Sequence, residues 1–176
     1  MRPILFAACL SLITAPAFAA GSEDSTPPQK TKTSTTCTDG QVWDEQKQAC
    51  AEAESSSLDD DALYGAAREL AYHGNPQAAL SVLAAMDAQN TARVHNYRGF
   101  ALRKLGRLDE AMAQYETALA LDPDYILARS YMGQAYLELG DFAGAHGQLL
   151  EIRNRGGRDT WAYVSLRQAM RGNPTY

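Results

Sequence analysis

The sequence predicts an all-α fold built from stacked pairs of antiparallel helices. An internal repeat is the first support, because glycine and alanine positions in one stretch recur 34 residues later in the same order. The matched positions are Gly99 with Gly133, Gly106 with Gly140, Ala111 with Ala145, and Tyr115 with Leu149. The second support is the helical spacing of the apolar residues between them. A repeat of this length is typical of helical hairpins that bury their apolar faces against their neighbours.

The middle repeat, residues 92–125, shows the pattern most clearly. Its first helix is expected to end at Gly106 and its second helix just before Pro123. Gly99 and Ala111 fall where the two helices should cross, and small side chains there allow the axes to approach to about 8–10 Å. We expect bulky residues at these positions to force the hairpin open.

Two further repeats flank the middle one, at residues 126–157 and 58–91. In the first repeat Gly65 keeps the 34-residue distance to Gly99, but the glycine that should end its first helix, Gly74, falls two residues late. The sequence therefore predicts a first helix that is longer by half a turn.

A capping helix is expected at residues 159–171, because stacked repeats contact only their neighbours and their ends need a polar outer face. Asp159 is the expected N-cap of this helix. Trp161 is expected to anchor it against the third repeat, and a ligand platform is the alternative role of this side chain. The helical domain would then span residues 58–172.

These repeats resemble the tetratricopeptide repeat (TPR) family, whose pattern is Trp-x-x-Leu-Gly-x-x-Tyr, then Ala-x-x-x-Phe, then Pro. The middle repeat matches this pattern at Gly99, Ala111, Pro123 and, in the Phe position, Tyr115. The stretch of residues 103–152 looks like the short secreted or periplasmic TPR proteins of Gram-negative bacteria. The resemblance implies a solenoid of about three repeats with a C-terminal capping helix.

The resemblance also implies a binding site, because the first helix of each TPR hairpin lines a concave groove. The residues that would present their side chains to a protein or peptide partner are Arg93, Asn96, Phe100, Arg103, Lys104, Ser130, Gln134 and Glu138. The lysine and asparagine clamp of the chaperone-binding members is replaced by Ala62 and Ala66 in the first repeat. A chaperone-adapter role is therefore disfavoured.

Residues 1–19 have the pattern of a secretory signal peptide, with one positive charge at Arg2, an apolar run, and Ala17 and Ala19 before the expected cleavage point. A retained membrane anchor and acylation at Cys9 are the alternatives. The signal peptide predicts a periplasmic or secreted protein without a membrane span after cleavage.

After cleavage two cysteines are left, Cys37 and Cys50, and an even count in an oxidising compartment predicts one disulfide. The expected product is a stapled hairpin over residues 37–50. Residues 20–36 are rich in Ser, Thr, Pro and Lys and predict a disordered tether, and residues 51–57 predict a linker. We expect the staple to be energetically independent of the repeats.

The disulfide loop has two candidate roles. It can be a local staple, or it can contact a glycan or the cell wall through Trp43. The loop contains, in this order, a cysteine, a glycine, an aromatic residue, an acidic residue and a second cysteine. In this order it is similar to the final disulfide loop of peritrophin-type chitin-binding modules. The remaining cysteines of that family are absent.

Charge and motifs argue against several function classes. The formal net charge is −5, which disfavours nucleic acid as a partner of an exported protein. His73, His95 and His146 form no metal-binding spacing, and no phosphate loop or haem motif is present, so we expect no metal, no cofactor and no enzyme. The sequence predicts a non-catalytic periplasmic adapter for protein partners. The alternative is a cell-wall or envelope-polysaccharide binding protein that acts through the Cys37 to Cys50 loop.

Overall fold

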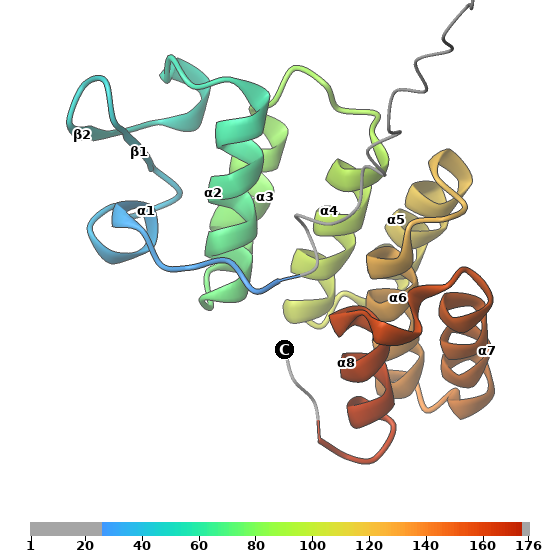
Figure 1. The fold of residues 1–176 in the computed structure, drawn as a ribbon. Helices are drawn as coiled ribbons and strands as arrows, with labels where there is room; N and C mark the ends of the chain where they lie inside the picture. Colours follow the sequence, from blue (N-terminus) through green and yellow to red (C-terminus); the bar gives the residue numbers. More distant parts are fainter. Residues whose placement is uncertain (1–25, 174–176) are drawn as a thin grey trace, which may run out of the picture.

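The computed structural model describes residues 26–173, so the predicted signal peptide at residues 1–19 lies outside the described residues. Six helices form three consecutive hairpins (Figure 1). Their bounds are Asp60–Tyr72 for α2, Pro76–Ala84 for α3, Ala92–Lys104 for α4, Leu108–Leu121 for α5, Ile126–Glu138 for α6 and Phe142–Asn154 for α7. The all-α hairpin solenoid predicted from the repeat is confirmed.

The hairpins stack so that α2, α4 and α6 form one layer and α3, α5 and α7 the other (Figure 1). Helix α4 contacts both α2 and α6, and α6 also packs against α5 of the preceding hairpin. The core between the layers holds fully buried side chains from successive repeats, including Leu83, Tyr97, Tyr115 and Tyr131. Each hairpin therefore buries its apolar face against the next one, as a solenoid requires.

Local signals in the sequence set the helix ends. Asn75 accepts a hydrogen bond from the Ala78 N–H at 3.3 Å, and Asp141 accepts one from the Gly144 N–H at 2.8 Å, so both cap the helix that follows. Gly106 and Gly140 adopt φ angles of 75° and 79° just after the first helix of their hairpins. These left-handed conformations favour glycine, which explains why the two positions recur in the repeat.

The glycines inside the helices differ in what they face. A Cβ atom at Gly99 would lie 2.6 Å from Cε1 of Tyr115, so Gly99 permits the close crossing of α4 and α5 that the repeat predicts. A Cβ atom at Gly133 would instead lie 2.6 Å from Cδ2 of Leu166. Gly133 is therefore small because the capping helix, and not the second helix of its own hairpin, approaches it.

The first repeat has a different register from the one predicted. Helix α2 has 13 residues, as do α4 and α6, so the prediction of a longer first helix is wrong. Helices α2 and α4 begin at Asp60 and Ala92, 32 residues apart, which places Ala67 and not Gly65 at the position of Gly99. Ala67 is fully buried, whereas a Cβ atom at Gly65 would meet nothing within 4 Å.

The capping helix α8 spans Trp161–Ala169 and follows a short 3-10 turn, Gly157–Asp159. Thr160 caps α8, because its hydroxyl oxygen accepts a hydrogen bond from the Tyr163 N–H at 3.3 Å. Asp159 belongs to the 3-10 turn, so its predicted role as N-cap is wrong. Helix α8 packs on α6 and α7 and buries Ala162 and Leu166.

The N-terminal part contains a disulfide between Cys37 and Cys50, as predicted. The disulfide closes a hairpin of two antiparallel strands, β1 at Val42–Asp44 and β2 at Ala49–Ala51. A one-turn helix, α1 at Lys32–Thr35, precedes the hairpin, and a 3-10 turn, Ala53–Ser55, follows it.

This hairpin is not separate from the repeats. Val42 is fully buried and Ala53 nearly so, and both belong to the same apolar core as α2 and α3. The residues before the hairpin, from Thr26 onward, also lie along α2, although their composition predicts a free tether (Figure 1). The N-terminal part thus covers the open end of the first repeat, because apolar side chains of the hairpin complete a core that the first repeat leaves exposed.

Within residues 26–173 no helix is both long and apolar enough to cross a bilayer. The same part of the chain holds no group of three or more His, Cys, Asp or Glu side chains that could bind a metal ion.

Candidate functional site

The candidate site is the face of the layer formed by α2, α4 and α6, which the sequence predicts as the binding groove. The structure buries five of the predicted groove residues. These are Asn96, Phe100, Arg103, Ser130 and Gln134. In this structure they pack between elements and do not line an open surface.

The capping helix explains two of these burials. It lies against α6 in Figure 1, where the Ser130 hydroxyl donates to the Ala162 carbonyl oxygen at 2.8 Å. The Gln134 amide donates to the Ser165 hydroxyl at 3.4 Å. Ser130 and Gln134 therefore recognise the chain's own C-terminal helix.

Aromatic packing explains the burial of Phe100. Its ring stacks on Tyr72 of α2 with centroids 5.2 Å apart and lies 4.7 Å from the ring of Tyr131 of α6. Tyr97 makes edge contacts with Tyr131 at 6.0 Å and with Tyr64 at 5.4 Å. A continuous row of rings thus joins the first helices of all three repeats, which fixes their spacing.

Charged side chains flank this aromatic row. Arg103 is buried and pairs with Glu138, so it links α4 to α6. Arg93 pairs with Asp61 at 2.6 Å, and its guanidinium carbon lies 4.8 Å from the Tyr64 ring centroid. Lys104 is exposed, with its ammonium nitrogen 5.5 Å from the Phe100 ring centroid. Partial desolvation of its ammonium group against the protein surface and the nearby Arg103 charge lower the pKa of Lys104.

The three predicted groove residues that keep exposed surface are therefore Arg93, Lys104 and Glu138. They come from α4 and from the end of α6. Together they present two cations and one carboxylate beside the aromatic row. Their role in partner binding stays a prediction.

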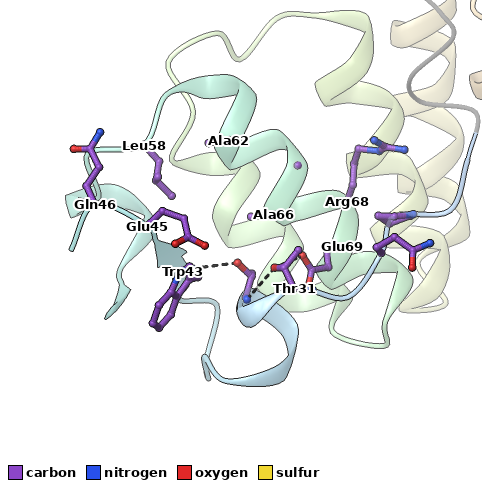
Figure 2. A pocket seen from close by; sticks show the side chains of 13 residues that line it. Thr31, Trp43, Glu45, Gln46, Leu58, Ala62, Ala66, Arg68 and Glu69 are labelled. Carbon is purple, nitrogen blue, oxygen red and sulfur yellow. Dashed lines mark hydrogen bonds between the residues drawn. The ribbon is translucent and has the colours of Figure 1, made fainter. Parts of the chain in front are cut away.

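The other end of the face is covered by the N-terminal segment, residues 26–36. Glu69 of α2 is almost fully buried there and accepts three hydrogen bonds from this segment. The Thr31 N–H and the Thr31 hydroxyl donate to its two carboxylate oxygens at 2.6 and 2.7 Å, and the Ser34 N–H donates at 3.0 Å. Figure 2 shows the side chain of Thr31 beside that of Glu69. A buried carboxylate with three donors is a strong anchor.

The environment of Glu69 shifts its pKa. Burial alone would raise the pKa of this carboxyl, but the hydrogen bonds from Ser34 and Thr31 outweigh burial and hold it below its ordinary value. The docked segment therefore prefers the ionised carboxylate. Docking is fully stabilised above the ordinary carboxyl pKa of about 4.3 and weakens as the pH falls through the lower pKa of the docked form.

We expect acid to release the segment from α2. The change can be followed by Trp43 fluorescence in a Trp161→Phe background, where Trp43 is the single tryptophan. A fluorescence transition should appear below about pH 4.3 and should vanish in Glu69→Gln, which cannot ionise. An unchanged transition in Glu69→Gln would assign the titration to another group.

A groove with a volume of about 560 Å³ lies between the segment, the disulfide hairpin and α2 (Figure 2). Its floor is α2, with the small residues Ala62, Gly65 and Ala66, and one wall carries Trp43 and Glu45. Leu58 adds an apolar side chain. The volume lies within the range of sites that hold small ligands or anchor side chains.

Trp43, the predicted glycan contact, lines this groove. The Lys32 ammonium nitrogen lies 4.1 Å from the centroid of its ring, so one face of the indole is already in contact with a cation. The Trp43 backbone N–H donates to the Thr33 hydroxyl at 3.1 Å. Trp43 therefore ties the hairpin to the N-terminal segment.

Sequence reasoning missed Glu69 and Arg68 as important residues of this face. The available signal was one carboxylate, Glu69, beyond the first turn of the first helix of the domain. Such a buried acid needs hydrogen-bond donors. The donors come from Thr31 and Ser34, 38 and 35 residues away, and no local pattern identifies them.

The comparisons with known proteins agree with the hairpin architecture. The family model of the TPR repeat matches residues 99–140, from the second half of α4 to the glycine after α6. Curated proteins and solved structures give no match to the chain. Residues 99–140 are thus similar to the tetratricopeptide repeat, within a helical-hairpin solenoid of the TPR type.

Proposed function

We propose that the protein is a non-catalytic adapter that binds a polypeptide partner on the face of α2, α4 and α6 and works in the periplasm. TPR repeats generally mediate contacts between proteins, which supports a protein partner. The signal-peptide pattern of residues 1–19 supports the periplasmic location.

The observation that carries the proposal is the arrangement of this face. The segment at residues 26–36 lies on α2 and α8 lies on α6, while α4 between them carries Arg93 and Lys104 at its two ends. The groove lies over α2, at the end of this layer that the hairpin covers. A partner polypeptide can therefore combine an apolar contact in the groove with charged contacts to α4.

Cross-linking in cells tests this surface. A photoreactive residue at Ala62 on the groove floor and one at Lys104 are expected to capture the same protein. Matched positions on the opposite layer, Ala84 of α3 and Glu116 of α5, are also exposed and serve as controls. They should give no such adduct, because they lie outside the proposed face.

Adducts of equal yield from all four positions would show non-specific capture. Absence of any protein adduct from Ala62 and Lys104 would exclude a protein-binding role for this face. Either result would remove the proposed function.

A further inference from the structure

The N-terminal segment makes its hydrogen bonds to one side of α2. Besides the three bonds to Glu69, the Arg68 guanidinium donates to the Thr26 carbonyl oxygen at 3.1 Å. His73 Nε2 lies 3.1 Å from the Pro28 carbonyl oxygen and donates to it when this nitrogen carries the proton. Arg68 and His73 thus bind carbonyl oxygens of the stretch before α1, and the Glu69 carboxylate accepts from the N-cap residue and from the first turn of α1.

Most of these bonds go to the backbone of the segment. The donors and acceptors are two N–H groups and two carbonyl oxygens, and Thr31 adds the single side-chain group, a hydroxyl. Backbone bonds supply affinity without requiring a particular sequence. The surface therefore suits a segment that begins one helical turn opposite Glu69 with a serine or threonine as its N-cap.

We propose that Arg68, Glu69 and His73 form a peptide-docking surface, which residues 26–35 occupy in the same chain. A segment of the partner that is extended, then forms one helical turn, and places a serine or threonine at the start of that turn takes the surface by displacing them. This inference rests on the proposed function, since it names the part of the face that holds the partner's backbone. It adds that the N-terminal segment is an internal competitor for that place.

The covalent connection of the segment to the disulfide hairpin makes this competition effective. The segment is continuous with Cys37, and the disulfide holds the hairpin beside α2, so the effective concentration of the segment is in the millimolar range or higher. A partner segment binds only the fraction of molecules in which the surface is open, and its apparent affinity is reduced by that fraction. Weakening the internal contact should therefore strengthen external binding.

The probe is a fluorescent synthetic peptide with the sequence of residues 26–36, Thr-Pro-Pro-Gln-Lys-Thr-Lys-Thr-Ser-Thr-Thr, measured by anisotropy against the full mature chain. Thr31→Ala in the chain removes one hydrogen bond between the internal segment and a charged group, so the surface is open in a larger fraction of molecules. The peptide should therefore bind this variant about tenfold more tightly than it binds wild type. Glu69→Ala removes the surface itself and should bind no peptide. The two variants thus change binding in opposite directions.

Two controls separate docking from folding. Thr36→Ala changes an exposed threonine just after α1, outside the groups that bond to Arg68, Glu69 and His73, and it should bind the peptide as wild type does. Glu69→Gln keeps the side-chain shape but loses the charge. It weakens the internal segment and the added peptide alike, so it should bind the peptide no more tightly than wild type and should lack the gain of Thr31→Ala. Far-UV circular dichroism of each variant checks that the repeats are folded.

Equal peptide affinity of wild type and Thr31→Ala would overturn the inference, as would binding to a folded Glu69→Ala chain. Formation of a dimer by exchange of residues 26–35 between two copies, seen by sedimentation, would assign the surface to self-association and also overturn it. The peptide assay needs no natural partner. If peptide affinity is the same for wild type and Thr31→Ala while Lys104 cross-links to a protein, this inference alone is removed. If the peptide behaves as expected while Ala62 and Lys104 capture no protein, only the proposed function is removed.

Discussion

Replacing both Cys37 and Cys50 with serine is expected to lower the melting temperature of the whole helical domain. A disulfide that closes a loop of this size stabilises by about 3 kcal/mol in the chain-entropy description. Val42 and Ala53 of the stapled part belong to the core of the first repeat, so this loss should reach the helices. For a domain of this size about 3 kcal/mol corresponds to roughly 6–12 °C.

The measurement is thermal unfolding followed by far-UV circular dichroism, combined with limited proteolysis. Wild-type protein reduced with a dithiol is the matched control, because it loses the same bond without a change of sequence. Both samples should melt earlier and be cleaved faster within residues 26–57. An unchanged melting temperature with fast cleavage would restore the independence of staple and repeats that the sequence predicts.

Gly133→Leu is expected to destabilise the protein by about 1–3 kcal/mol through overpacking. A Cβ atom at this position already lies within 2.6 Å of Leu166, which is fully buried between α8 and α6. The added side chain must push α8 away from α6. Chemical denaturation monitored by circular dichroism gives the free energy of unfolding, and Trp161 fluorescence reports the position of α8.

Gly147→Leu is the matched control. Gly147 is also inside a helix, α7, but a Cβ atom there would meet nothing within 4 Å. Replacing a helical glycine at an open position should be neutral or stabilise by up to about 1 kcal/mol, because glycine is a poor helix former. Equal stability of the two variants would show that α8 does not pack on Gly133.

The acid-sensitive contact and the disulfide act on the same element. Glu69 holds the segment before α1, and the disulfide holds the hairpin after it. Loss of either should leave the packing of helices α4, α5, α6 and α7 on one another intact, because this packing depends on the aromatic row and on the crossings within the hairpins. The N-terminal part is therefore a region whose cover of the proposed binding face can change without unfolding the repeats.

The exposed part of the proposed binding face was only partly predictable from the sequence. The TPR resemblance points to the first helices of the hairpins as the binding face, but it assumes that nothing covers them. Ser130 and Gln134 are polar residues on α6, and only the docking of α8 shows that their hydrogen bonds are made within the chain. Lys104 and Glu138 keep exposed surface because they lie at the ends of their helices.

The sequence by itself determined the helical hairpins and the disulfide. Helix periodicity, the caps Asn75 and Asp141, and the left-handed glycines Gly106 and Gly140 are local features, and each acts within a few residues of the helix end that it sets. The pairing of Cys37 with Cys50 follows from their being the two cysteines after the predicted cleavage point.

Only the tertiary structure decided how the two ends of the solenoid are closed. A polar segment rich in Ser and Thr has no periodic signature, so its docking depends on Thr31 meeting the buried Glu69 from 38 residues away. The register of the first repeat, with Ala67 in place of Gly65, likewise follows from packing. The assembled core determines which distant polar groups meet. It also determines which of several small residues lies at a helix crossing, and no local pattern contains this information.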